Sequence, residues 1–152
     1  MLKPGDTAGD FVLKNQSDVE INTADFAGKR LLLSFHPLAW TSVCAKQMKT
    51  LEDNYDAFED LNVVPLGISC DPAPSKKAWA ESLEIEQTDL LSDFWPHGEV
   101  CKKMDVFIEK MGISGRFNII LGPDRKVLWS KIYPIKEVPD IKEVLEFLKK
   151  RK

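Results

Sequence analysis

The strongest constraint on the fold is an apolar run over residues 31–36 that stops at a proline. The run reads Leu-Leu-Leu-Ser-Phe-His, and Pro37 follows it directly. A short apolar run that ends at such a break is typical of a strand buried inside a sheet. From Ser42 to about Phe58 the period becomes helical. The residues that mark one face of this helix are Cys44, Met48, Leu51, Tyr55 and Phe58. The chain therefore predicts a strand, a proline-stopped loop and a helix, with a cysteine in the helix's first turn.

The rest of the chain predicts an alternation of strands and helices. In the first half of the chain we expect a strand or hairpin within 10–28, a strand over 62–69 that contains Pro65, and a helix capped by Ser75 and running to Leu83. A loop over 89–98 and a short helix over about 99–104 should follow. The chain should then form a hairpin of 117–121 and 126–133 and a last helix that begins near Pro139. Strands joined by helices and closed by a hairpin and a helix predict a mixed central β-sheet with helices on both faces. The predicted fold class is α/β, thioredoxin-like, with one domain over residues 1–152.

The bulk properties exclude several classes of function. The chain has 152 residues and a formal net charge of −3, so neither nucleic acid nor an anionic membrane is expected as a partner. No apolar run approaches the roughly 20 residues that span a bilayer, and the first residues do not have the composition of a signal peptide. Three cysteines without tight spacing do not form a secreted disulfide framework. We therefore expect a cytoplasmic protein with thiols available for chemistry.

Cys44 has two interpretations when only the periodicity is considered. A cysteine at a helix N-terminus faces free N–H groups and the positive end of the helix dipole, which favour a reactive thiolate. However, Cys44 also shares an apolar stripe with Met48 and Leu51, and free cysteine is among the most buried residue types. Thr41 is similarly ambiguous, because a threonine before a helix is a good N-cap whatever the chemistry.

A family resemblance decides between these interpretations. Residues 37–44, Pro-Leu-Ala-Trp-Thr-Ser-Val-Cys, resemble the Pro-x-x-x-Thr/Ser-x-x-Cys motif of the peroxiredoxins. Arg116 precedes the predicted hairpin as the active-site arginine of that family does. The stretch 90–98, Leu-Leu-Ser-Asp-Phe-Trp-Pro-His-Gly, is similar to the alkyl hydroperoxide reductase E type, which is usually described as one-cysteine. The resemblance extends over nearly the whole chain.

The resemblance implies a thiol peroxidase that reduces hydrogen peroxide, alkyl hydroperoxides or peroxynitrite. Cys44 would attack the peroxide and become a sulfenic acid, and Thr41 would orient the peroxide. Arg116 would stabilise the thiolate and the charge that develops on the breaking O–O bond. Pro37 would shield the pocket from water, and the backbone N–H groups of Val43 and Cys44 would complete the donor set. This chemistry needs no metal, flavin or haem.

Two residues near the motif depart from the family pattern. Gln47 stands where the family commonly has glutamate, and an amide accepts from an arginine without a negative charge. We expect this site to be more positive than is usual and its local unfolding to be altered. Trp40 stands where phenylalanine is common. It would border the peroxide pocket or a dimer contact, or be structural.

The route by which the sulfenic acid is reduced stays open. The resemblance implies an external thiol reductant of the thioredoxin, glutaredoxin or mycoredoxin kind, and a homodimer. Cys101 is the alternative resolving thiol, which would make the mechanism an atypical two-cysteine one. Cys70 ends a predicted buried strand and is expected to be core.

A reactive thiol could also serve two other classes of function. A thiol–disulfide oxidoreductase would need Cys-x-x-Cys, and Gln47 occupies the second position of that pattern after Cys44. A peroxide sensor or holdase would share the reactive thiol but turn over poorly. His36 and His97 match no zinc spacing with the cysteines, so no metal site is expected.

Overall fold

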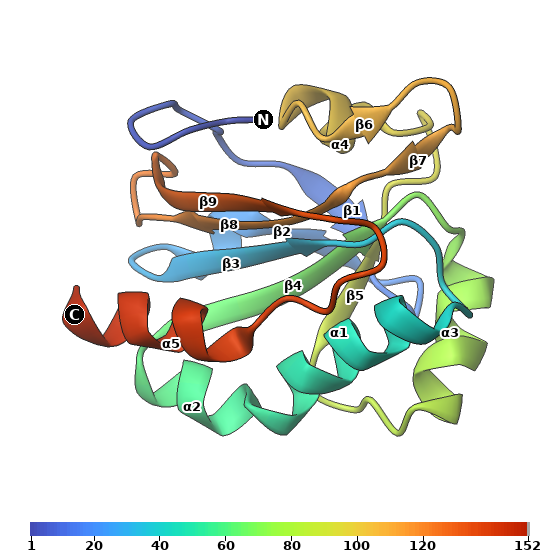
Figure 1. The fold of residues 1–152 in the computed structure, drawn as a ribbon, viewed down its shortest axis with the longest axis horizontal. Helices are drawn as coiled ribbons and strands as arrows, with labels where there is room; N and C mark the ends of the chain where they lie inside the picture. Colours follow the sequence, from blue (N-terminus) through green and yellow to red (C-terminus); the bar gives the residue numbers. More distant parts are fainter. Residues whose placement is uncertain (152) are drawn as a thin grey trace.

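The computed structural model describes residues 1–151 and contains a seven-stranded mixed sheet with the order β2-β1-β5-β4-β3-β8-β9 (Figure 1). Its strands are β1 (Val12–Lys14), β2 (Glu20–Asn22), β3 (Arg30–Phe35), β4 (Val63–Ser69), β5 (Asp89–Ser92), β8 (Arg116–Leu121) and β9 (Val127–Tyr133). β3, β4 and β5 run parallel, and the other pairs are antiparallel. A separate pair consists of β6 (Phe107–Ile108) and β7 (Ile113–Ser114).

Helices cover both faces of the sheet, which confirms the predicted thioredoxin-like α/β class. They are α1 (Ser42–Asp53), α2 (Tyr55–Asp60), α3 (Ala73–Ser82), α4 (Glu99–Lys103) and α5 (Ile141–Lys150), with a short 3-10 helix, η1 (Thr23–Phe26). Figure 1 shows α1, α2 and α5 below the sheet and α4 with the β6–β7 pair above it. Among the described residues, no helix is long and apolar enough to cross a membrane.

Alternation along β3 sends its side chains into two hydrophobic clusters. Leu31, Leu33 and Phe35 belong to the cluster shared with α4, whereas Leu32 packs with α1, α3 and α5. All four side chains are 0% exposed, as expected for a central strand covered on both faces. The position of α1 immediately after this strand places Cys44 against the α1-side face of the sheet.

Three predicted elements differ from the structure. The helix expected over 42–58 is interrupted at Asn54, where ψ changes to 13° and α2 starts anew. The helix expected from Ser75 begins at Ala73, with Pro72 in the N-cap position. The loop predicted over 89–98 is wrong at its start, because residues 89–92 form β5.

Pro65 lies inside β4, as the sequence predicted. It is paired with Leu32 of β3, while β5 pairs with β4 only from Leu66 onward. At Pro65 the strand therefore has a neighbour on one side only, which is where a residue without an N–H is tolerated in a sheet.

Candidate active site

The first turn of α1 carries the candidate nucleophile. Cys44 is 0% exposed, and Thr41 holds the N-cap position. The backbone ladder of the helix begins with the bond from the Ala45 N–H to the Thr41 carbonyl oxygen, at 2.9 Å. The peptide N–H groups of Val43 and Cys44 precede this bond and belong to the positive end of the helix dipole. The sulfur thus lies where an anion is stabilised.

Arg116, the first residue of β8, contacts this sulfur. Its Nη1 donates to Cys44 Sγ at 3.3 Å and to Gln47 Oε1 at 2.7 Å. On the other edge of the guanidinium, Nε and Nη2 donate to the Ile135 carbonyl oxygen at 3.0 and 2.7 Å. Arg116 is 2% exposed, and these bonds hold its planar group in one orientation. The structure brings together Cys44, Gln47 and Arg116, which the sequence predicted as site residues.

Gln47 connects the arginine to the sheet below it. Its side chain is 3% exposed, and its Nε2 donates to Ser34 Oγ at 2.8 Å and to the Phe35 carbonyl oxygen at 3.1 Å. The Ser34 hydroxyl in turn donates to Asn118 Oδ1 at 2.8 Å. Every polar group of this chain of contacts is paired, so Arg116 is positioned by a rigid and buried network.

The loop before α1 is shaped by its own contacts. Pro37 is buried, and the Thr41 hydroxyl donates to the Leu38 carbonyl oxygen at 2.7 Å. The Thr41 side chain makes no N-cap bond. Trp40 has a φ of 69° and is 57% exposed, with its Nε1 donating to Ser75 Oγ at 3.2 Å. Trp40 is thus a surface residue of the loop and not part of the core.

A buried lysine lies behind the contacts that hold this loop, and no pattern in the sequence predicted it. The Ala39 N–H donates to Asp71 Oδ2 at 2.9 Å, and the Ser69 hydroxyl donates to the same oxygen at 2.6 Å. Lys76, which is 0% exposed, donates from Nζ to Ser69 Oγ and to the Leu91 carbonyl oxygen, both at 2.8 Å. Burial lowers the pKa of Lys76 from 10.5 to about 7, although Asp71 opposes this shift.

This constellation, a thiol at a helix start held by a buried arginine, agrees with the comparisons of the chain with known proteins. The model of the AhpC/TSA family matches residues 4–130. The chain belongs to the AhpC/TSA family. It is 36% identical over 141 residues to alkyl hydroperoxide reductase E of Mycobacterium tuberculosis, and the aligned residues cover 92% of each chain. It is 38% identical over 109 residues to peroxiredoxin Bcp of Escherichia coli, covering 72% of this chain and 68% of that one.

Solved structures agree with the family assignment. Peroxidoxin BcpB from Mycobacterium tuberculosis superimposes with a TM-score of 0.88 at 25% identity, covering 100% of this chain and 99% of that chain. The reduced 2-Cys peroxiredoxin of Plasmodium vivax has the same fold, with a TM-score of 0.88 at 24% identity and coverage of 98% and 81%. The AhpC/TSA protein described here is thus a peroxiredoxin and a thiol-dependent peroxidase.

In the described part of the chain, neither His36 nor His97 forms a hydrogen bond with Cys44. His36 is fully buried against Trp79, with ring centroids 5.5 Å apart, and neither of its ring nitrogens has a partner in the described part of the chain. Burial lowers the pKa of His36 well below its ordinary range. His97 is exposed, and its ring nitrogens lie 3.2 Å from the Phe94 carbonyl oxygen and 2.7 Å from that of Gly112. It is a loop residue, as predicted.

The other two cysteines pair with each other. Cys70 Sγ and Cys101 Sγ are 3.9 Å apart, and both belong to the hydrophobic cluster on the α4 side of the sheet. Cys44 belongs to the cluster on the opposite side. The sheet therefore lies between Cys44 and Cys101, the residue predicted as an alternative resolving thiol.

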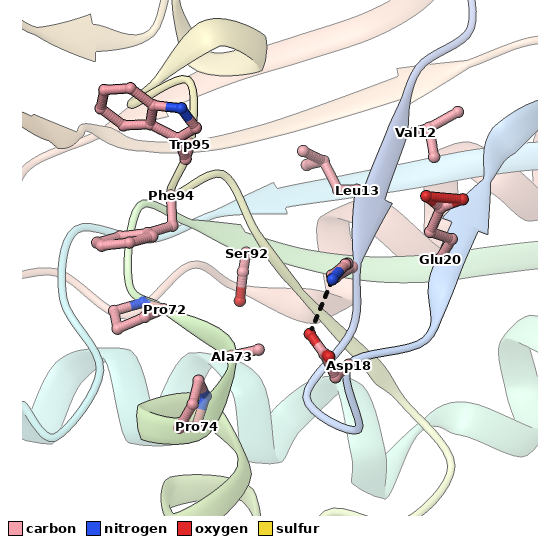
Figure 2. A pocket seen from close by; sticks show the side chains of 11 residues that line it. Val12, Leu13, Asp18, Glu20, Pro72, Ala73, Pro74, Ser92, Phe94 and Trp95 are labelled. Atoms are coloured by element: carbon pink, nitrogen blue, oxygen red, sulfur yellow. Dashed lines mark ion pairs between the residues drawn. The ribbon is translucent and has the colours of Figure 1, made fainter.

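A groove of the family member lies between the β1–β2 hairpin and the start of α3. It has a volume of about 580 Å³ and is bordered by the β1–β2 hairpin, the start of α3 and the Phe94–Trp95 segment. Figure 2 shows Asp18 on one wall and the aromatic side chains of Phe94 and Trp95 on the other. Asp18 forms an ion pair with Lys14. None of the predicted site residues lines this groove.

Proposed function

We propose that Cys44 is the peroxidatic cysteine of this peroxiredoxin. The observation that best supports this proposal is the contact of 3.3 Å between Arg116 Nη1 and Cys44 Sγ at the N-terminus of α1. The Cys44 thiolate attacks the terminal oxygen of the peroxide, so that an S–O bond forms and the O–O bond breaks. The alkoxide or hydroxide that leaves takes up a proton to become alcohol or water, and the cysteine becomes a sulfenic acid.

The remaining predicted residues stabilise charge, orient the peroxide or exclude water. Arg116 stabilises the thiolate and the negative charge on the breaking O–O bond, since its orientation is fixed before the reaction. The Thr41 hydroxyl donates to Leu38, so its oxygen can accept from the O–H of the peroxide. Pro37 shields the sulfur from water, and the N–H groups of Val43 and Cys44 supply further donors.

An external thiol completes the cycle. It attacks the sulfenic sulfur, water leaves, and a second thiol reduces the mixed disulfide. A thioredoxin-, glutaredoxin- or mycoredoxin-like donor fits this role. The alternative, in which Cys101 resolves Cys44, requires movement of α1 or α4, because the two sulfurs lie in clusters on opposite faces of the sheet.

The proposed assembly is a homodimer formed through the active-site loops. Leu38 and Trp40 are 42% and 57% exposed, and Phe94 and Trp95 are 48% and 83% exposed. A contiguous patch of exposed apolar side chains is typical of an interaction surface, and we propose that these four side chains contribute to one. Sedimentation equilibrium measures the mass of the assembly, and a monomer would contradict this part of the proposal. We further propose a cytoplasmic location and one domain over residues 1–152; residue 152 lies outside the described residues.

Peroxide consumption with dithiothreitol as reductant tests the function. The wild type should turn over alkyl hydroperoxide many times, and Cys44→Ser should lose most of this turnover. Cys70→Ser is the matched control, since it removes a buried thiol outside the proposed site and should retain the turnover that depends on Cys44. Stoichiometric oxidation of Cys44 without turnover would favour the sensor or holdase, and no oxidation at all would refute the peroxidase role of this residue.

A further inference from the structure

The pairing of Cys70 with Cys101 has no role in the peroxidase cycle proposed above. The two sulfurs are in contact at 3.9 Å, and their side chains are 5% and 0% exposed. They are 31 positions apart in the chain, so the fold, and not the local sequence, brings them together. We propose that Cys70 and Cys101 form a second redox centre that closes to an intramolecular disulfide when it reacts with a peroxide.

The geometry allows the bond to form with a small movement. A disulfide needs the sulfurs about 2 Å apart, so they must approach by roughly half of their present separation. Cys70 lies just after the end of β4, and Cys101 lies in α4, a helix of only five residues. Because neither residue lies in the middle of a long element, side-chain rotation and a slight shift of α4 can bring the sulfurs together.

The surroundings assign different roles to the two thiols. A hydrogen bond from Cys101 lowers the pKa of Cys70, whereas the bond to Cys70 together with burial raises the pKa of Cys101. Lys76 lies within electrostatic range of both sulfurs, because negative charge on either one raises its pKa. Cys70, the more exposed thiol, is therefore the one that reacts first.

The reaction balances with peroxide as the only oxidant. The Cys70 thiolate attacks one peroxide oxygen, the O–O bond breaks, and the leaving oxygen takes a proton to become alcohol or water. The Cys101 sulfur then attacks the Cys70 sulfenic sulfur, the S–S bond forms and the S–O bond breaks. The departing hydroxide takes the Cys101 proton as water. An Asp93 carboxylate oxygen lies within 4.8 Å of both sulfurs and can relay this proton.

Asp93 also raises the possibility of a metal site formed by the same three residues, and the structure disfavours it. Both Asp93 carboxylate oxygens already accept backbone N–H groups, from Val100 at 3.1 Å and Cys101 at 2.8 Å. These bonds hold the start of α4. Zinc is usually bound by four ligands, of which a catalytic site leaves one to water. Three buried ligands, one of them already used as a helix cap, make a poor zinc site, and a disulfide needs only the two sulfurs.

The test uses the full chain with Cys44→Ser, which leaves Cys70 and Cys101 as the remaining cysteines. With excess hydrogen peroxide and no reductant, this variant should consume one peroxide per chain and lose two hydrogen atoms in intact mass. Digestion without reduction should give one peptide that joins residues 70 and 101, and dithiothreitol should restore the mass. Wild type should consume at least two peroxides per chain, because Cys44 takes one and its unresolved sulfenic acid is oxidised further by excess peroxide.

Control variants and alternative outcomes keep the proposal falsifiable. Adding Cys101→Ser should leave Cys70 as a sulfenic acid or a more oxidised form, without the linked peptide. The proposal is overturned by an unchanged mass, by a Cys44–Cys101 peptide in wild type, or by stoichiometric zinc in the purified protein. If Cys44→Ser fails to fold, Cys44→Ala and the wild-type peptide map decide in the same way. Since the variant lacks Cys44, these outcomes are independent of the proposed peroxidatic role.

Discussion

Replacing Lys76 by methionine tests the electrostatics beneath the active-site loop. The amine is fully buried and donates to Ser69 Oγ and to the Leu91 carbonyl oxygen. Burial lowers its pKa from 10.5 to about 7. Methionine has a similar length and no charge, so the substitution removes this titration while retaining most of the packing volume.

The sign and the size of the effect follow from proton linkage. Because the pKa of Lys76 is lower in the folded chain than in the unfolded chain, the unfolded chain binds more protons between pH 7 and 10.5. The free energy of unfolding therefore rises with pH across this window. A shift of one pKa unit corresponds to about 1.4 kcal/mol, so the full difference of roughly 3.5 units amounts to about 5 kcal/mol. Below pH 7 the lysine is protonated in both states and its cost to folding is fully present.

Urea unfolding followed by tryptophan fluorescence, at several pH values between 7 and 9.5 and under reducing conditions, measures this term. The wild-type free energy of unfolding should rise relative to that of Lys76→Met by about 1.4 kcal/mol per pH unit. Lys77→Met, at an exposed position of the same helix, should show the wild-type pH dependence. If wild type and Lys76→Met change in parallel with pH, Lys76 is charged in the folded protein or accessible to water, and the reasoning is wrong.

Three further substitutions test the site and its scaffold. Arg116→Met should slow the oxidation of Cys44 by about 10²–10³-fold in stopped-flow fluorescence, and a change of less than about tenfold would contradict its role. Gln47→Glu places a carboxylate against a buried backbone carbonyl and disfavours the Cys44 thiolate. The oxidation of Cys44 at neutral pH should therefore slow, and the free energy of unfolding in urea should fall by about 1–3 kcal/mol. An equal or faster rate of oxidation would refute this. Burial opposes ionisation of Glu52, but hydrogen bonds from the backbone of residues 86–88 outweigh it and lower its pKa. Glu52→Gln should therefore cost about 1–2 kcal/mol at pH 7, and the difference should shrink as pH falls below about 4.5.

The sequence predicted those parts of the fold that depend on local patterns. The apolar run before Pro37 predicted β3, and the alternating and helical periods predicted the bounds of most other elements to within a few residues. The break at Asn54 was missed because the apolar face continues in phase from α1 into α2, so that periodicity does not register it. β5 was missed because it has only four residues and polar residues at both ends.

The candidate site divides in the same way. Cys44 and Thr41 lie in a local motif, and the resemblance supplied Arg116. The carbonyl oxygen of Ile135 that holds the arginine belongs to the main chain, and no sequence pattern marks such a contact. Lys76 was missed because a Ser-Lys-Lys segment is typical of a solvated helix face, and only tertiary contacts show that its amine is buried.

Gln47 accepts a hydrogen bond from Arg116 but leaves its charge unbalanced, and its own amide N–H groups explain how the departure from the usual glutamate is accommodated. Its amide donates to Ser34 Oγ and the Phe35 carbonyl oxygen, two positions that a carboxylate could not serve without a rearranged network. In the described part of the chain, Arg116 forms no ion pair with a carboxylate. A buried cation without a counter-ion is costly, and in the proposed mechanism the Cys44 thiolate is the anion that contacts it. In that mechanism, oxidation to a neutral sulfenic acid removes the anion, and we therefore expect the closed site to be less stable once the peroxide has been reduced.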